Sequence, residues 1–258
     1  MNNLEKYYNK FNEDKRLLSR HGQVEFYIAM KYINQIIGRE RGLDIIDIGA
    51  GTGRYSKVLA DMGHNLTAVE LVQKNVSQIK EKNQNIKAIK GNALDLKKFK
   101  NDSFDIALLF GPIYHLFTFE DKLKAINEAK RVVKPGGYIF IMYLMADYAI
   151  VSYAFKEGNL QKSLKDGKLN NKFQVLNLED DLYSYVRIEE INGLKKASGL
   201  KRYKIIAIDG ATDYIRPVLN KLSQEDFELF IKYQESICER KELLGASSHV
   251  MDILKKED

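Results

Sequence analysis

The sequence has little that would indicate a secreted, disulfide-stabilised protein. Cys238 is the single cysteine in 258 residues, so no intrachain disulfide can form. This cysteine usage is typical of proteins from a reducing compartment. The opening stretch, MNNLEKYYNKFNEDKR, has no apolar run that could act as a signal peptide. We therefore expect a cytoplasmic protein.

Long apolar runs are also scarce, and only residues 138–155 approach the length of a membrane span. Asp147 interrupts this run, and Pro135-Gly136-Gly137 precedes it as a turn signal. We interpret it as a buried strand that runs into an apolar helix, and we expect no membrane partner. Neither a repeat nor a low-complexity segment is visible.

The positive charge is modest and spread out. Lys plus Arg total 41 and Asp plus Glu total 35, which gives a formal charge of +6. Lysines recur in two polar segments, 162–172 and 195–204, in the pattern of solvated faces. This pattern favours a small-molecule partner over nucleic acid, and we expect a monomer or a homodimer.

Apolar runs and helical patterns alternate through the middle of the chain. The pattern predicts strands at 44–48, 65–71, 86–90, 104–110 and 138–143, and helices at 54–62, 72–83 and 120–133. Strands that alternate with helices predict an α/β fold with a parallel sheet covered on both faces. Lys134-Pro135-Gly136-Gly137 is expected to end the last of these helices and to turn into the fifth strand.

The flanks of this region follow other patterns. Residues 1–40 are predicted to form a helical cap, with Tyr7, Tyr8 and Phe11 on one face and a helix that ends near Gly38. Residues 145–185 lack a strand pattern and are expected to be a lid or insertion. In 186–258 we expect a helix that ends at Gly199, a strand at 203–209, two helices after it and a short final strand. The whole is predicted to be one domain, with 41–144 as its ligand-binding core.

The most informative stretch is Asp44 to Ser56, where an apolar strand ends in an acid and three glycines follow. Gly49, Gly51 and Gly53 are spaced G-x-G-x-G, and Asp47 stands two residues before the first. Glycines at such a turn let a ligand approach the backbone, and the next helix presents its N–H groups there. Dinucleotide binders use G-x-G-x-x-G instead, and a carboxylate beside a pyrophosphate would be repulsive. A cationic cofactor suits Asp47 better.

The ends of the next strands support a nucleoside ligand. Glu70 ends the second strand, where a carboxylate can accept hydrogen bonds from both hydroxyls of a ribose. The third strand runs into GNALDL, and the fourth ends in FGPIYHL. In an open α/β sheet these carboxyl ends lie along one edge, which is where ligands bind.

In order and spacing, DIGAGTG, AVEL, GNALDL, DSFDIALLFGPIYHL and VVKPGGYIFI resemble the motifs of class I S-adenosylmethionine (SAM)-dependent methyltransferases. The resemblance covers residues 44–143. The prefix and the tail LLGASSHVMDIL also resemble a bacterial small-molecule branch of that family. It implies a Rossmann-like, doubly wound, seven-stranded and mostly parallel sheet, with SAM as cofactor and no metal.

The resemblance also implies roles for individual residues. Gly49, Gly51 and Gly53 would line the methionine end of SAM beside Asp47, and Glu70 would hold the ribose. The remaining cofactor contacts would come from Leu71, Asn92, Ala93, Phe110 and Gly111. The family usually has Asp where this chain has Asn92, which keeps an acceptor oxygen and loses the charge; Asp95 is a nearby alternative.

Tyr114 and His115, just past the fourth strand, are the candidates to take a proton from the methyl acceptor. His249 could face the same cleft or be buried for structural reasons. Tyr148, Tyr153 and Phe155 could enclose a substrate or pack in the core. Enzymes that methylate base amines carry a motif such as N-P-P-Y where this chain has FGPIY, which favours a small-molecule O or N acceptor. An RNA or protein acceptor, or an inactive SAM-binding regulatory protein, is the alternative.

Overall fold

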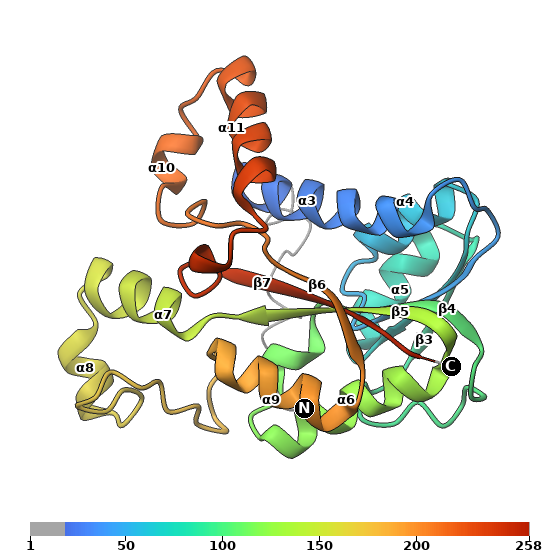
Figure 1. The fold of residues 1–258 in the computed structure, drawn as a ribbon, viewed down its shortest axis with the longest axis horizontal. Helices are drawn as coiled ribbons and strands as arrows, with labels where there is room; N and C mark the ends of the chain where they lie inside the picture. Colours follow the sequence, from blue (N-terminus) through green and yellow to red (C-terminus); the bar gives the residue numbers. More distant parts are fainter. Residues whose placement is uncertain (1–18, 258) are drawn as a thin grey trace.

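The computed structural model describes residues 19–257, and its centre is a seven-stranded sheet with helices on both faces (Figure 1). The strand order is β3-β2-β1-β4-β5-β7-β6. Only β7 runs antiparallel to its neighbours β5 and β6. The predicted Rossmann-like, mostly parallel sheet is confirmed. The predicted aromatic face of Tyr7, Tyr8 and Phe11 lies outside the described residues.

The strands fall close to the stretches predicted from the sequence. Their bounds are β1 (Asp44–Ile48), β2 (Asn65–Glu70), β3 (Ile86–Lys90), β4 (Phe104–Leu109), β5 (Val133–Leu144), β6 (Lys201–Ala207) and β7 (His249–Lys255). The start of β5 differs from the prediction, because the strand pairing with β4 begins at Val133. Its register then shifts around Gly136, whose φ of 78° makes the predicted turn a bulge within the strand.

The helices of the core connect these strands. Their bounds are α3 (Arg20–Ile37), α4 (Arg54–Asp61), α5 (Gln73–Lys82), α6 (Phe119–Val132), α9 (Ile188–Ser198) and α11 (Gln224–Ile237). Helix α11 begins after Ser223, whose Oγ accepts from the backbone N–H of Asp226. The first of the two helices predicted after the 203–209 strand is only one turn, α10 (Arg216–Leu219).

Two apolar layers result from the alternation of side chains along the strands. Ile45 and Ile106 pack with α3, α4 and α5 on one face, whereas Ile46 and Ala107 pack with α6 on the other. Figure 1 shows these helix groups on opposite sides of the sheet. Because α3 places its apolar face against the sheet, the described part of the predicted cap is a core helix as well.

The 145–185 segment leaves the sheet at the end of β5. It contains α7 (Ala146–Ala149), which continues as a π-helix at Ile150–Lys156, and α8 (Leu160–Lys165). Asn177 ties its later part together, because its side chain exchanges hydrogen bonds with the backbone of Tyr185. No helix among residues 19–257 is both long and apolar enough to cross a membrane.

Candidate functional site

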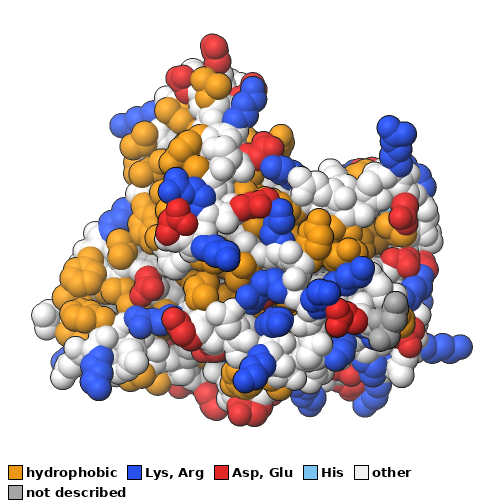
Figure 2. All heavy atoms as spheres, viewed as in Figure 1, with side chains coloured by type: hydrophobic (Ala, Val, Ile, Leu, Met, Phe, Trp, Pro, Cys, Tyr) orange, Lys and Arg blue, Asp and Glu red, His pale blue; other side chains and the backbone are white. Residues whose placement is uncertain are grey.

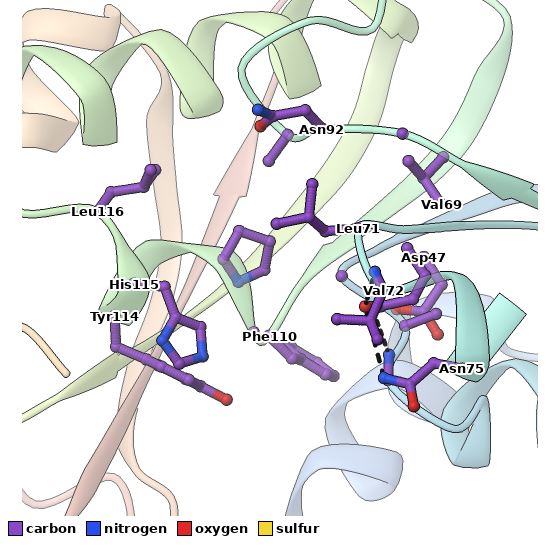
Figure 3. A pocket seen from close by; sticks show the side chains of 18 of the residues that line it. Asp47, Val69, Leu71, Val72, Asn75, Asn92, Phe110, Tyr114, His115 and Leu116 are labelled. Atoms are coloured by element: carbon purple, nitrogen blue, oxygen red, sulfur yellow. Dashed lines mark hydrogen bonds between the residues drawn. The ribbon is translucent and has the colours of Figure 1, made fainter. Parts of the chain in front are cut away.

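A cavity of about 600 Å³ opens at the carboxyl edge of β1, β2, β3 and β4 (Figure 3). It is lined by eleven of the twelve residues predicted for the site: Asp47, Gly49, Gly51, Glu70, Leu71, Asn92, Ala93, Phe110, Gly111, Tyr114 and His115. Gly53 is the exception and does not line it. The parallel strands end together at this edge, which is why motifs far apart in sequence meet here.

The glycines after β1 and β4 have different structural roles. A Cβ on Gly49 would lie 2.5 Å from Cδ of Pro112, and one on Gly111 would lie 3.1 Å from the Gly49 carbonyl oxygen. These two glycines therefore let the turns after β1 and β4 touch and form the floor of the cavity. Gly53 caps α4 in the left-handed conformation, and a Cβ there would lie 2.9 Å from Ile79. Its role is helix packing.

Glu70 is buried and already holds the glycine turn. Its carboxylate accepts the Gly51 N–H at Oε2 and the Val72 N–H at Oε1, each at 2.9 Å. Burial raises the pKa of this carboxyl group, and the backbone hydrogen bonds oppose the shift. Each oxygen can accept a further hydrogen bond, so Glu70 can hold a ribose while it fixes the turn.

Asp47 is 2% exposed and accepts a hydrogen bond of 2.6 Å from the hydroxyl of Ser56. Burial raises its pKa to about 6, the Ser56 bond lowers it, and the nearby charge of Glu70 raises it. Two buried carboxylates that both resist ionisation gain from a cation between or beside them.

The cavity as a whole is acidic although the chain is basic. Among the described residues that line it, the carboxylates are Glu25, Asp47, Glu70, Glu179 and Asp181, whereas Arg54 is the single Lys or Arg. This charge pattern opposes a pyrophosphate and favours the sulfonium and ammonium groups of SAM. The residues present therefore fit this cofactor.

The adenine side of the cavity matches the prediction less closely. Asn92 is exposed at the rim (Figure 3), and its Oδ1 accepts the backbone N–H of Leu94 at 3.0 Å. Asp95, the alternative to it, does not line this cavity and pairs with Lys97 instead. Ala93 and Leu71 supply apolar surface beside Asn92.

His115 and Tyr114 follow β4 on a single 3₁₀ turn, Pro112–His115. His115 donates through Nδ1 to the Leu182 carbonyl oxygen at 2.8 Å, which places Leu182 over the cavity. Burial lowers the pKa of His115 to about 4, so the imidazole is neutral near pH 7 and a weak proton acceptor. The geometry gives this ring a positioning role, and its assignment as a base stays a prediction.

Several lining residues were not predicted. Glu25 is a buried acid on the apolar face of α3, in line with Ile28, Ala29 and Tyr32. An acid at that position of an amphipathic helix was the available signal. Glu179, Asp181 and Leu182 come from the 145–185 segment, whose sequence has no periodicity that would place them. Tyr148, Tyr153 and Phe155 do not line the cavity, and the latter two are exposed.

The sheet order and the residues at its carboxyl edge are similar to those of class I SAM-dependent methyltransferases. Residues 46–141 match the methyltransferase domain family. The chain is 20% identical over 119 residues to a ubiquinone biosynthesis O-methyltransferase of Leptothrix cholodnii, covering 44% of this chain and 49% of that protein. It thus spans about half the length of the curated relatives that it matches.

Solved structures share the fold over nearly the whole chain. A chain from the complex of the Haloferax volcanii Trm112 methyltransferase activator with a methyltransferase aligns with a TM-score of 0.64 at 15% identity, covering 100% of this chain and 99% of that one. A possible histamine N-methyltransferase of Thermotoga maritima aligns with a TM-score of 0.59 at 20% identity, covering 98% of each chain. At these identities the likeness concerns the fold. Residues 46–141 thus match a methyltransferase domain, and the residues that line the cavity fit SAM as its cofactor.

Proposed function

We propose that the protein is an enzyme that transfers the methyl group of SAM to an oxygen or nitrogen atom of a small molecule. The observation that carries this proposal is the acidic cavity. Its lining combines the glycine turn, which would bind SAM, with Tyr114 and His115, which lie past the end of β4. Bound SAM supplies an electrophilic methyl group. Glu70 and the glycine turn would hold its nucleoside and methionine parts, and Asp47 would neutralise its positive charge.

The small-molecule acceptor is supported by size and surface charge. A volume of about 600 Å³ lies in the range of small-ligand sites and would be shared by cofactor and acceptor. On the face shown in Figure 2, Lys and Arg side chains alternate with Asp and Glu side chains instead of forming a basic band. The curated relative from Leptothrix cholodnii, an O-methyltransferase by name, agrees with a small acceptor.

Cofactor binding and turnover test the proposal separately. By calorimetry, Glu70→Gln should weaken binding of SAM and of S-adenosylhomocysteine at least tenfold, because a charged acceptor is lost. Glu81→Gln removes the same charge from the exposed face of α5 and should leave binding unchanged. Equal affinity in the two variants would refute the site.

Release of S-adenosylhomocysteine with small-molecule alcohols, phenols and amines would support the enzyme. Tight SAM binding without release across that panel would favour the SAM-binding regulatory protein instead. Turnover with RNA or protein alone would move the assignment to a macromolecular methyltransferase.

A further inference from the structure

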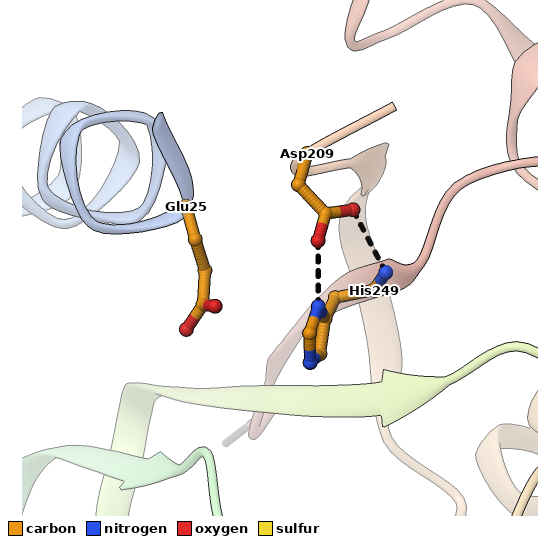
Figure 4. Close-up of side chains that lie close together, drawn as sticks. All are labelled: Glu25, Asp209 and His249. Atoms are coloured by element: carbon orange, nitrogen blue, oxygen red, sulfur yellow. Dashed lines mark hydrogen bonds and ion pairs between the residues drawn. The ribbon is translucent and has the colours of Figure 1, made fainter. Parts of the chain in front are cut away.

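A second cluster of titratable side chains lies beside the cofactor cavity, at the same edge of the sheet. Glu25 of α3, Asp209 after β6 and His249 at the start of β7 each place a ligand atom within 4.8 Å of the others (Figure 4). Glu25 is 4% exposed and Asp209 is 3% exposed. The antiparallel direction of β7 brings His249 to this edge, opposite Leu144 at the end of β5.

Asp209 holds His249 by both of its oxygens. Its Oδ2 lies 2.6 Å from Nδ1 of His249, and its Oδ1 accepts the backbone N–H of His249 at 2.8 Å. The hydroxyl of Ser247 donates to the same Oδ1 at 2.8 Å. A carboxylate beside Nδ1 keeps the proton on that nitrogen, so Nε2 carries the basic lone pair. Figure 4 shows the ring of His249 and the carboxylate of Glu25 facing the space between them.

The cluster adjoins the cavity through Glu25, whereas Asp209 and His249 do not line it. Glu25 lines the cavity, as does Tyr114, whose ring centroid is 6.4 Å from that of His249. Phe110, which the methyltransferase resemblance places at the sulfonium end of SAM, also lines the cavity and packs on Tyr55 with centroids 4.8 Å apart. An acceptor atom between Glu25 and His249 would therefore approach the methyl group from the side of α3.

From this geometry we propose that the acceptor is a primary or secondary amine, bound as its ammonium by Glu25, and that His249 is the base that deprotonates it. This inference rests on the proposed function and narrows its acceptor to nitrogen. The acidic surroundings favour a cation over a neutral alcohol, and Asp209 acts as the positioning residue for His249.

Methyl transfer from SAM to the amine needs no further reactant. The ammonium gives one proton to Nε2 of His249, and the freed nitrogen lone pair forms the bond to the methyl carbon. The bond between that carbon and sulfur breaks, and its electron pair stays on sulfur as a neutral thioether. His249 then returns the proton to solvent.

The groups around His249 fit this role. Ser248 Oγ lies 3.3 Å from Nδ1 of His249 and donates to Asp213, which is paired with Arg216. Tyr148 also donates to Asp213, at 2.9 Å. The carboxylates of Glu25 and Asp209 lie next to His249 and would stabilise an imidazolium.

The test uses matched probes with the full chain and SAM: 2-phenylethylamine, histamine and putrescine, each beside the alcohol of equal length. We expect release of S-adenosylhomocysteine with at least one amine, and an N-methyl product by mass spectrometry. Glu25→Gln should raise KM for that amine at least tenfold, with the affinity for S-adenosylhomocysteine within threefold of wild type. Glu81→Gln should change neither value.

His249→Gln should lower kcat about a hundredfold near pH 7, in the range of lost acid–base catalysis. The deficit should shrink toward pH 10, where a much larger fraction of the amine is already deprotonated in solution. Asp209→Asn should lower kcat with little change in KM, and thermal unfolding with bound S-adenosylhomocysteine reports whether these variants stay folded. A deficit that is the same at pH 7 and pH 10 would overturn the role of His249.

Other outcomes would overturn the amine as acceptor without refuting the SAM site. Methylation of the alcohols alone would do so, as would SAM binding with no methylated amine. Activity that is lost in EDTA and restored by Mn²⁺, with one bound metal per chain, would make the cluster a metal site. Failure to bind SAM at all would instead refute the proposed function.

Discussion

At the scale of single residues, two buried acids lie beside the glycine turn. Their burial lowers the free energy of unfolding, and their charge favours the binding of a cationic ligand. Asp47 and Glu70 are both removed from water, and burial raises the pKa of both. A protein tolerates such groups where a ligand later supplies the missing charge. The site is thus built for the complex with a cationic ligand.

The charge of Asp47 can be tested through pH. Its pKa is about 6 in the folded chain against 3.8 as the ordinary value, so the folded state holds an extra proton between these pH values. The contribution of Asp47 to the free energy of unfolding is therefore most favourable below about pH 4 and declines as pH rises to 6. Asp47→Asn should be more stable than wild type above pH 6 by about 1–3 kcal/mol, measured by urea denaturation without ligand.

Cofactor affinity should show the opposite trend in the wild type. A cationic ligand prefers ionised Asp47, so SAM should bind about tenfold more weakly at pH 5 than at pH 7. Asp47→Asn should bind weakly at both pH values and lose most of this dependence, as calorimetry would reveal. A wild-type affinity that rises on acidification would contradict the assigned charge interaction.

Most of the residues predicted to hold the cofactor line the cavity, because each of them follows a recognisable strand end. Glu70 and Asp47 follow apolar runs, and a parallel sheet places such positions at one edge. Glu25 and Asp209 could not be assigned this way. Glu25 reaches the cavity through the packing of a whole helix, and Asp209 meets His249 only because β7 runs antiparallel to β6.

At the scale of secondary structure, we expect Gly53 of the motif to stabilise the fold without contacting the cofactor. Gly53 has a φ of 82°, and a side chain there would press on Ile79 of α5. Gly53→Ala should lower the free energy of unfolding by about 1–3 kcal/mol, from the left-handed backbone and the close contact. Its SAM affinity at a temperature where it is folded should stay near wild type.

Gly49→Ala is the matched comparison for that variant. Its new methyl group would meet Pro112 at the floor of the cavity, so we expect it to weaken SAM binding as well as folding. Urea denaturation and calorimetry on both variants separate the two effects. Equal losses of affinity would show that Gly53 contacts the cofactor after all.

One buried ion pair joins strands β6 and β7. Arg202 of β6 donates to both oxygens of Asp252 on β7, each at 2.7 Å, and the Asp252 side chain is fully buried. Arg202→Met would leave that carboxylate without its partner and should cost about 2–4 kcal/mol of unfolding free energy. Lys201→Met, which breaks an exposed pair with Glu257, should cost less than about 1 kcal/mol.

Adding Asp252→Asn to Arg202→Met should restore part of the loss, since the buried charge is then gone. No recovery in the double variant would assign the destabilisation to the packing of the arginine side chain. The pair also bears on the proposed site, because Asp209 lies just past the end of β6 and His249 is the first residue of β7.

At the scale of the whole molecule, the mostly parallel sheet and its two covered faces followed from the sequence, whereas the course of the 145–185 segment did not. Alternating apolar runs fix a parallel sheet through its burial on both sides. The later segment is held by separate side-chain contacts, such as Asn177 with Tyr185 and Lys168 with Asp181. Such contacts have no periodicity, so they leave no signal in the sequence.

The same contacts make this segment a candidate to respond to ligand binding. It reaches the cavity through Glu179, Asp181 and Leu182, and it is joined to the core turn by His115 with Leu182 and by the Ser184 N–H with the Tyr114 carbonyl oxygen, both at 2.8 Å. We expect S-adenosylhomocysteine to slow backbone amide deuterium exchange across residues 177–186 in the wild type.

His115→Phe keeps a ring beside Tyr183 and removes the hydrogen bond to Leu182, so exchange in this stretch should speed up and the ligand effect should shrink. His64→Phe changes another buried histidine, outside the cavity, and should leave exchange there unchanged. Because burial keeps His115 neutral, its bond to Leu182 should persist from pH 6 to pH 8, and the protection should be constant over that range. Protection that is identical in His115→Phe and wild type would show that the core turn does not hold the segment over the cavity.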